Sequence, residues 1–206
     1  MVSFNRISIP SSFGHVINNL FLKHDQAASH LVVLLPGMYN THESPLLYYS
    51  ANVALQAGCD VLGIEYGYHH SGHSYSSEMF ESTLGETLEA LRSCGIEQYH
   101  RVSFISKSFG TIIAGEATRH FTSVKAHNLF LTPIARTIPY INEGDCTVIF
   151  GTADPLFSQD DADKISGNVQ VISLPGADHS LTMDNDYRKS LDFLGDVCEI
   201  VNKFLK

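Results

Sequence analysis

Short apolar runs that alternate with segments of helical periodicity constrain this chain more than any other feature. The runs that we interpret as strands are residues 31–35, 61–64, 102–105, 128–131, 147–150 and 169–174. The segments that we interpret as their main helices are residues 45–57, 80–91, 109–120 and 187–204. Such alternation produces parallel strands joined by right-handed crossovers, with helices on both faces of the sheet. The sequence therefore predicts an α/β fold with a mostly parallel central sheet.

The first residues of the chain follow a different pattern. Residues 3–9 and 15–22 are two strand-like segments, and the residues between them, Ser11, Ser12, Phe13 and Gly14, favour a turn. This pattern predicts an N-terminal antiparallel hairpin that adds an edge to the sheet. No repeat, linker or low-complexity tract interrupts the sequence, so we expect residues 1–206 to form one domain.

The charge of the chain argues against a polyanionic partner. The sequence contains 13 Lys and Arg against 22 Asp and Glu, a formal net charge of −9 with neutral histidine. Nucleic-acid binding requires a cationic surface, so we predict no nucleic-acid partner. No stretch of eighteen apolar residues is present, so we expect no membrane partner either. The sequence makes no prediction of an oligomeric state.

Cysteine usage and the first residues of the chain favour the cytoplasm. The four cysteines are scattered, and no two have metal-ligand spacing. We therefore expect reduced thiols. The chain begins without the charged and apolar segments of a secretion signal, so we predict a cytoplasmic protein.

A serine motif follows the third predicted parallel strand. The segment Ser106-Lys107-Ser108-Phe109-Gly110 places small residues two positions before and after Ser108. It resembles the nucleophile elbow of α/β-hydrolases, usually written G-x-S-x-G, with Ser106 in place of the first glycine. Ser106 is the alternative nucleophile, but the position two before it is Phe104, which is too bulky for the turn. The resemblance therefore implies that Ser108 is the nucleophile; the simpler interpretation is a serine that caps a helix.

The resemblance also implies an acid and a base later in the chain. In α/β-hydrolases the order is serine, acid, histidine, each after a successive strand. Asp154 follows the predicted strand 147–150 in a Gly-x-x-Asp turn, and His179 follows the predicted strand 169–174 in a Gly-x-x-His loop. Asp154 and His179 are thus the candidate acid and base. Each could instead be an ordinary loop residue, and the nearby Asp160, Asp161 and Asp163 are assigned to the start of a helix.

The same resemblance identifies an oxyanion hole and a candidate substrate wall. One backbone donor would be the N–H of Phe109, and the second would be the N–H of Met38 in the segment Pro36-Gly37-Met38. Tyr39, Phe157 and Leu181 are candidates for an apolar wall at the substrate, or else part of the core. Residues 133–146 are too few to fold as a lid, so we expect no cap domain and an open site.

A cluster of histidines is the weaker signal. His69 and His73 are four residues apart, a spacing that binds zinc on a helix. Gly67, Ser71 and Gly72 disfavour a helix there, so we expect a polar loop at the rim of the site and no metal. The resemblance implies no cofactor.

These observations together predict a serine hydrolase that cleaves a carboxylic ester or thioester. The partner would be a small-molecule acyl substrate, attacked by a Ser108–His179–Asp154 triad through an acyl-enzyme. Two alternatives stay open. One is a peptidase or amidase that uses the same triad, and the other is a binding protein without catalytic activity on a hydrolase scaffold.

Overall fold

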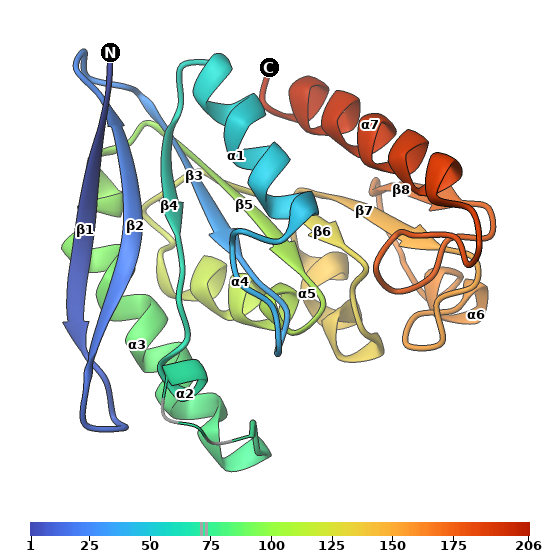
Figure 1. The fold of residues 1–206 in the computed structure, drawn as a ribbon, viewed down its shortest axis with the longest axis horizontal. Coiled ribbons are helices and arrows are strands. Elements are labelled where there is room, and N and C mark those ends of the chain that lie inside the picture. Colours follow the sequence, from blue (N-terminus) through green and yellow to red (C-terminus); the bar gives the residue numbers. More distant parts are fainter. Residues whose placement is uncertain (71, 73) are drawn as a thin grey trace.

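The computed structural model describes residues 1–70, 72 and 74–206. Within these residues the strands form one sheet in the order β1-β2-β4-β3-β5-β6-β7-β8 (Figure 1). The strands are β1 (Val2–Pro10), β2 (Val16–His24), β3 (His30–Leu35), β4 (Asp60–Gly63), β5 (Arg101–Lys107), β6 (Ala126–Leu131), β7 (Cys146–Gly151) and β8 (Gln170–Leu174).

The sheet is mostly parallel, as the sequence predicts. From β4 to β8 every neighbouring pair is parallel. The hairpin of β1 and β2 is antiparallel, and β2 joins β4 in antiparallel register from Leu20 opposite Gly63 to Leu22 opposite Val61. The predictions of a parallel sheet and of an N-terminal antiparallel hairpin at its edge are therefore confirmed.

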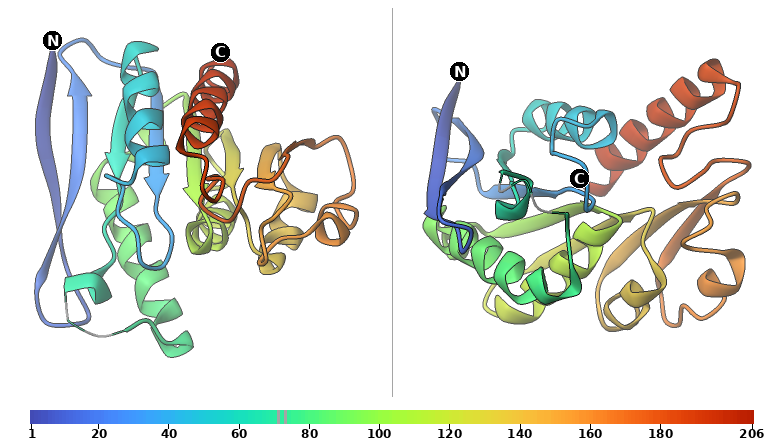
Figure 2. Two further views of the ribbon diagram at one scale, coloured as in Figure 1. Left: turned by 45° about the vertical axis from the view of Figure 1, so that its right-hand side comes forward. Right: turned by 60° about the horizontal axis from the view of Figure 1, so that its bottom comes forward.

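Helices cover both faces of this sheet. The two layers lie on opposite sides of the strands, with α1 and α7 on one face and α3, α4 and α5 on the other (Figure 2). The helices are α1 (Pro45–Gln56), α2 (Gly67–His70), α3 (Phe80–Ser93), α4 (Phe109–His120), α5 (Ile138–Glu143), α6 (Gln159–Ala162) and α7 (Tyr187–Phe204), with 3-10 turns at Ser77–Met79, Ile96–Gln98 and Ala135–Thr137.

The alternation of side chains along β3 explains why its sequence is apolar throughout. Leu31, Val33 and Leu35 are buried with residues of α3 and α4, whereas Val32 and Leu34 are buried with residues of α1 and α7. Both faces of the strand therefore lie in a core, and a strand covered on both faces requires a continuous apolar run.

Several local features differ from the expectations. Ser44 is the N-cap residue of α1, but its side chain makes no capping hydrogen bond. A short helix, α2, forms where glycines predict a loop, and it includes His69. His73 and Ser71 lie outside the described residues. Between β6 and β7 the chain forms a 3-10 turn and α5. In contrast, α6 agrees with the helix start that the sequence assigned to Asp160 and Asp161, and it begins with a capping box between Ser158 and Asp161.

Candidate active site

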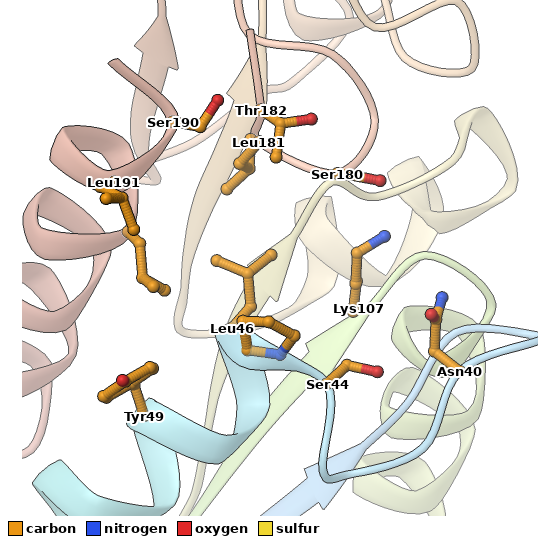
Figure 3. Close-up of a pocket in the computed structure, with 12 residues that line it drawn as sticks. Asn40, Ser44, Leu46, Tyr49, Lys107, Ser180, Leu181, Thr182, Ser190 and Leu191 are labelled. Atoms are coloured by element: carbon orange, nitrogen blue, oxygen red, sulfur yellow. The ribbon is translucent and has the colours of Figure 1, made fainter. Parts of the chain in front are cut away.

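The carboxyl ends of the parallel strands meet at one edge of the sheet, where α/β folds bind ligands. A cavity of about 490 Å³ opens at this edge, between α1, α7 and the end of β5 (Figure 3). Its walls are mostly apolar. The residues that line it are Asn40, Ser44, Pro45, Leu46, Tyr49, Lys107, Ser180, Leu181, Thr182, Ser190, Leu191 and Leu194.

Ser108 occupies the sharp turn between β5 and α4. Its backbone lies at φ 52° and ψ −119°, a conformation that residues with a side chain rarely adopt. Hydrogen bonds hold the turn on both sides: the Ser108 N–H donates to the Leu131 carbonyl at 3.1 Å, and the Thr111 N–H donates to the Ser108 carbonyl at 3.0 Å. The strain is therefore maintained by the ordered strand and helix that flank the turn.

The small residues around Ser108 have a steric cause. A Cβ atom at Gly110 would lie 2.4 Å from the Leu35 carbonyl oxygen and 2.6 Å from that of Pro36. Only glycine allows α4 to start this close to the end of β3. Ser106, which replaces the first glycine of the motif, is fully buried, and its hydroxyl has no hydrogen-bond partner among the described residues.

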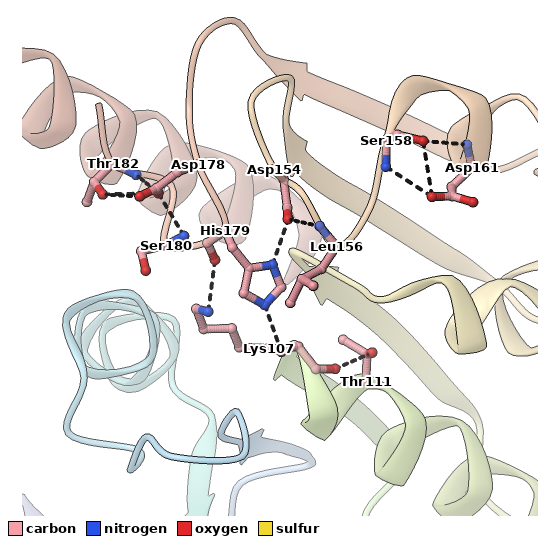
Figure 4. A network of polar contacts seen from close by, with 11 residues as sticks. Lys107, Thr111, Asp154, Leu156, Ser158, Asp161, Asp178, His179, Ser180 and Thr182 are labelled. Carbon is pink, nitrogen blue, oxygen red and sulfur yellow. Dashed lines mark hydrogen bonds and ion pairs between the residues drawn. The ribbon is translucent and has the colours of Figure 1, made fainter. Parts of the chain in front are cut away.

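The structure brings His179 within hydrogen-bonding distance of both Ser108 and Asp154, and Figure 4 shows His179 between Asp154 and the end of the strand that carries Lys107. His179 Nε2 lies 2.8 Å from the Ser108 hydroxyl, and His179 Nδ1 lies 2.7 Å from Asp154 Oδ2. A carboxylate only accepts, so Nδ1 carries the proton and Nε2 is free to accept from the serine. This is the geometry that a nucleophile and its base require.

Asp154 is held on its other side as well. Its side chain is completely buried, and its second oxygen accepts a hydrogen bond from the Leu156 N–H at 2.8 Å. The loops that carry Asp154 and His179 lie directly against each other, because the Ala153 N–H donates to the Ala177 carbonyl. A Cβ at Gly151 would be 2.0 Å from that carbonyl oxygen, so this approach requires glycine.

The segment that carries Met38 lies beside the serine. A Cβ atom at Gly37 would be 3.4 Å from the Ser108 Cβ. Among the described residues, neither the Met38 N–H nor the Phe109 N–H donates to another backbone group. Phe109 is the first residue of α4, where backbone N–H groups lack intrahelical partners. Both predicted donors are therefore available to an external acceptor.

The side chains of Tyr66, Tyr68 and His69 hold this segment, which we call the oxyanion loop (residues 36–40) after its predicted donor Met38. The sequence placed His69 only in a polar loop at the rim of the site and assigned the two tyrosines no role. The Met38 carbonyl accepts hydrogen bonds from the Tyr68 hydroxyl at 2.8 Å and from His69 Nε2 at 2.7 Å. The Pro36 carbonyl accepts from the Tyr66 hydroxyl at 2.9 Å. Burial, reinforced by neighbouring tyrosines, raises the pKa of Tyr66 and of Tyr68, so both hydroxyls remain donors.

Lys107 is an unusual neighbour for the serine because it is a buried amine. Its Nζ donates to the His179 carbonyl at 3.0 Å. Burial lowers the pKa of Lys107, although the nearby carboxylates of Asp154 and Asp178 oppose that shift. Burial alone would raise the pKa of Asp178, but hydrogen bonds from Thr182 and Ser180 lower it below its usual value. Lys107 thus ties the strand before Ser108 to the loop that carries His179.

The three residues predicted for a substrate wall lie in different places. Leu181 lines the cavity of Figure 3 and is otherwise buried. Tyr39 is 73% exposed and lines a separate depression next to Tyr68 and His69. Phe157 is fully buried, and its ring packs against Phe150 at a centroid distance of 5.4 Å. Phe157 is therefore a core residue, and it belongs to a small buried cluster with Phe150 and Ala162.

The comparisons with known proteins concern the fold. No protein-family model and no curated protein matches the sequence. Among solved structures, an esterase from Pyrococcus furiosus gives a TM-score of 0.72 at 14% identity, over 99% of this chain and 93% of the esterase. An α/β serine hydrolase without a lid from Xanthomonas campestris gives 0.69 at 14% identity, over 98% and 95% of the two chains. Dienelactone hydrolase from Anabaena variabilis gives 0.71 at 15% identity, over 98% and 97%.

This chain has the α/β-hydrolase fold. The likeness extends over nearly the whole length of each compared chain, and it confirms the fold that the motif around Ser108 implied. At identities of 14–15% these comparisons establish the α/β-hydrolase fold. The activity depends on the chemistry of the site, because one fold carries many activities.

The described residues offer no metal cluster: no three His, Cys, Asp or Glu side chains gather where they could hold a metal ion. Of the two histidines with zinc spacing, His73 lies outside the described residues. No helix in the described part of the chain has the length and apolar character to cross a bilayer.

Proposed function

We propose that this protein is a serine hydrolase that cleaves carboxylic esters or thioesters through an acyl-enzyme intermediate. The observation that carries the proposal is the continuous pair of hydrogen bonds from Ser108 through His179 to the buried Asp154. The order of these residues in the chain and the α/β-hydrolase fold support it.

In this mechanism Ser108 Oγ attacks the acyl carbon while His179 Nε2 takes its proton. The tetrahedral intermediate carries an oxyanion, which the N–H groups of Met38 and Phe109 stabilise. His179 then gives the proton to the leaving alcohol or thiol, and the acyl group remains on Ser108. His179 then takes a proton from a water molecule, whose oxygen attacks the acyl carbon. The bond from that carbon to Ser108 Oγ breaks, the acid is released, and His179 returns the proton to Oγ. Throughout, Asp154 fixes the proton on Nδ1 of His179 and stabilises the imidazolium.

Alanine substitutions of two serines, Ser108 and Ser106, test which of them is the nucleophile. Ser108→Ala is expected to lower kcat/KM for p-nitrophenyl esters by at least about a thousandfold, the loss seen when a triad member is removed. Ser106→Ala is the matched control, because the buried Ser106 hydroxyl has no partner among the described residues and its removal breaks no hydrogen bond. A Ser108→Ala protein as active as the wild type would overturn the assignment.

A fluorophosphonate probe separates an enzyme from a binding protein on the same scaffold. An activated Ser108 displaces fluoride and becomes phosphonylated, so mass spectrometry should find the adduct on the peptide that contains Ser108. A folded protein that the probe leaves unmodified would argue for a non-catalytic binding role. Matched aminoacyl amides assayed beside the esters test the peptidase or amidase alternative.

A further inference from the structure

The cavity between α1 and α7, which we call the α1–α7 pocket, begins beside the triad. Three of its lining residues are direct neighbours of the site: Lys107 precedes Ser108, Ser180 follows His179, and Asn40 closes the turn of the oxyanion loop. Lys107 Nζ also bonds the His179 carbonyl at 3.0 Å. Ser108 and His179 do not line the pocket themselves, but the end that Lys107, Ser180 and Asn40 line is the end next to them.

The pocket changes character along its length. Asn40, Ser44, Lys107 and Ser180 gather at the end beside the triad (Figure 3). Tyr49 of α1 and Leu191 of α7 lie at the opposite end, with Leu46 between (Figure 3). The volume of about 490 Å³ lies within the range of small-molecule sites. Four of the polar residues therefore lie at the triad end, whereas Thr182 and Ser190 lie on the α7 side and the other walls are mainly apolar.

We infer that the α1–α7 pocket binds the acyl chain, and that the preferred substrates are esters or thioesters of uncharged aliphatic acids longer than acetate. This inference rests on the proposed hydrolase function. Beyond that function, it specifies the path of the acyl chain, which runs from Ser108 between α1 and α7 toward Leu191.

The charge distribution disfavours an acyl group with a distal carboxylate. Among the described residues that line the pocket, Lys107 alone is charged, and it lies at the triad end with its ammonium bonded to the His179 carbonyl. A carboxylate at the far end of the chain would lie against Leu191 and Leu194 without a cationic partner. Desolvating it there is unfavourable. An octanoyl ester should therefore be a better substrate than the corresponding half-ester of suberic acid.

The test measures kcat/KM for p-nitrophenyl acetate, butyrate, octanoate and the suberate half-ester. Each buried methylene contributes about a fourfold gain in binding, so octanoate is expected to exceed acetate by at least about tenfold. The suberate half-ester is expected to fall at least about tenfold below octanoate, because its carboxylate must be desolvated.

Two pairs of matched variants locate the effect. Leu191 on α7 and Tyr49 on α1 line the pocket and are 60% and 47% exposed, so Leu191→Glu and Tyr49→Glu add a charge without opening the core. Tyr187 on α7 is 69% exposed, Gln56 at the end of α1 is also exposed, and neither lines the pocket, so Tyr187→Glu and Gln56→Glu are the controls. The octanoate-to-acetate ratio is expected to fall at least about tenfold in the first pair and to keep its wild-type value in the second.

The outcomes distinguish a failure of the acyl pocket from a failure of the proposed hydrolase function. Suppose that Ser108 of the wild-type enzyme reacts with fluorophosphonate. If that enzyme nevertheless prefers acetate, or if Leu191→Glu and Tyr49→Glu leave its octanoate-to-acetate ratio unchanged, the acyl pocket is wrong and the hydrolase proposal stands. Equal rates for octanoate and the suberate half-ester overturn the claim that the acyl group is uncharged. A wild-type protein with neither labelling nor ester hydrolysis overturns the proposed function and this inference together.

Discussion

Ser108 combines a strained backbone with the position of the proposed nucleophile. At φ 52° its Cβ crowds the backbone, which costs about 1–3 kcal/mol in such conformations. Glycine tolerates these angles, although it loses more chain entropy on folding. We predict that Ser108→Gly has a free energy of unfolding about 1 kcal/mol above that of Ser108→Ala, since both lack the hydroxyl and only alanine keeps the strain. Urea denaturation of the two variants checks this, and an equal or more stable alanine variant would contradict it.

Lys107 makes stability depend on pH in the alkaline range. Because burial lowers its pKa from the ordinary 10.5, the folded protein releases this proton at a lower pH than the unfolded chain does. Over that interval the unfolded chain binds more protons, so raising the pH favours the folded state. We predict that the wild-type free energy of unfolding rises relative to that of Lys107→Met as the pH increases from neutral to about 10. If the difference in free energy of unfolding between the two proteins stayed constant across this range, the pKa of Lys107 would not be lowered in the folded protein.

The oxyanion loop is held by an element that lies about thirty residues away in sequence. The hydroxyl of Tyr68 and the ring of His69, both on α2, bond the Met38 carbonyl and so orient the following turn. We predict that Tyr68→Phe lowers kcat about tenfold with little change in KM, because a misaligned donor weakens binding of the oxyanion more than that of the substrate.

The control for Tyr68→Phe is Tyr99→Phe. The Tyr99 hydroxyl donates to Asp60, the first residue of β4. Asp60 therefore lies at the amino ends of the parallel strands, whereas the site lies at their carboxyl ends. Its loss removes a comparable hydrogen bond without touching the oxyanion loop. If both variants lost kcat equally, the effect would be one of general stability and the positioning role of Tyr68 would be wrong.

Glycines in two helices have opposite requirements. At Gly110, in the first turn of α4, a Cβ would meet backbone oxygens of Leu35 and Pro36, so Gly110→Ala is expected to destabilise the protein by about 2 kcal/mol or more and to lower activity. At Gly85, in α3, a Cβ would meet nothing within 4 Å. Gly85→Ala is therefore expected to stabilise the protein by about 0.5–1 kcal/mol with activity retained. Thermal unfolding and ester hydrolysis of both variants check the signs.

The sequence predicted those elements whose residues are determined locally. A strand buried on both faces, such as β3, must be apolar throughout, and the turn at Ser108 must have small neighbours, so both leave a visible pattern. The bond from Tyr68 to the Met38 carbonyl leaves none, because it joins α2 to the loop after β3 only once the sheet has formed. For Phe157 the sequence left both a substrate wall and the core open, since an aromatic residue after a strand has the same appearance in both settings, and the structure places it in the core.

At the scale of the whole molecule, the candidate triad joins the centre of the sheet to its edge. Ser108 follows β5, which pairs with strands on both sides and is buried along nearly its whole length. His179 follows β8, which pairs with β7 alone and is mostly exposed. Local unfolding begins where few buried contacts hold the backbone. The position of the base is therefore less stable than the position of the nucleophile.

This difference predicts that the triad fails before the fold does. With increasing urea, fluorophosphonate labelling of Ser108 should be lost at a lower concentration than the far-ultraviolet circular dichroism signal, because opening of β8 removes His179 while the central strands remain paired. Hydrogen exchange gives the independent measurement: amides of Val171 and Ile172 in β8 should exchange faster than those of Phe104 and Ile105 in β5. Coincident loss of labelling and secondary structure, with equal protection of the two strands, would instead mean that the sheet opens as one cooperative unit.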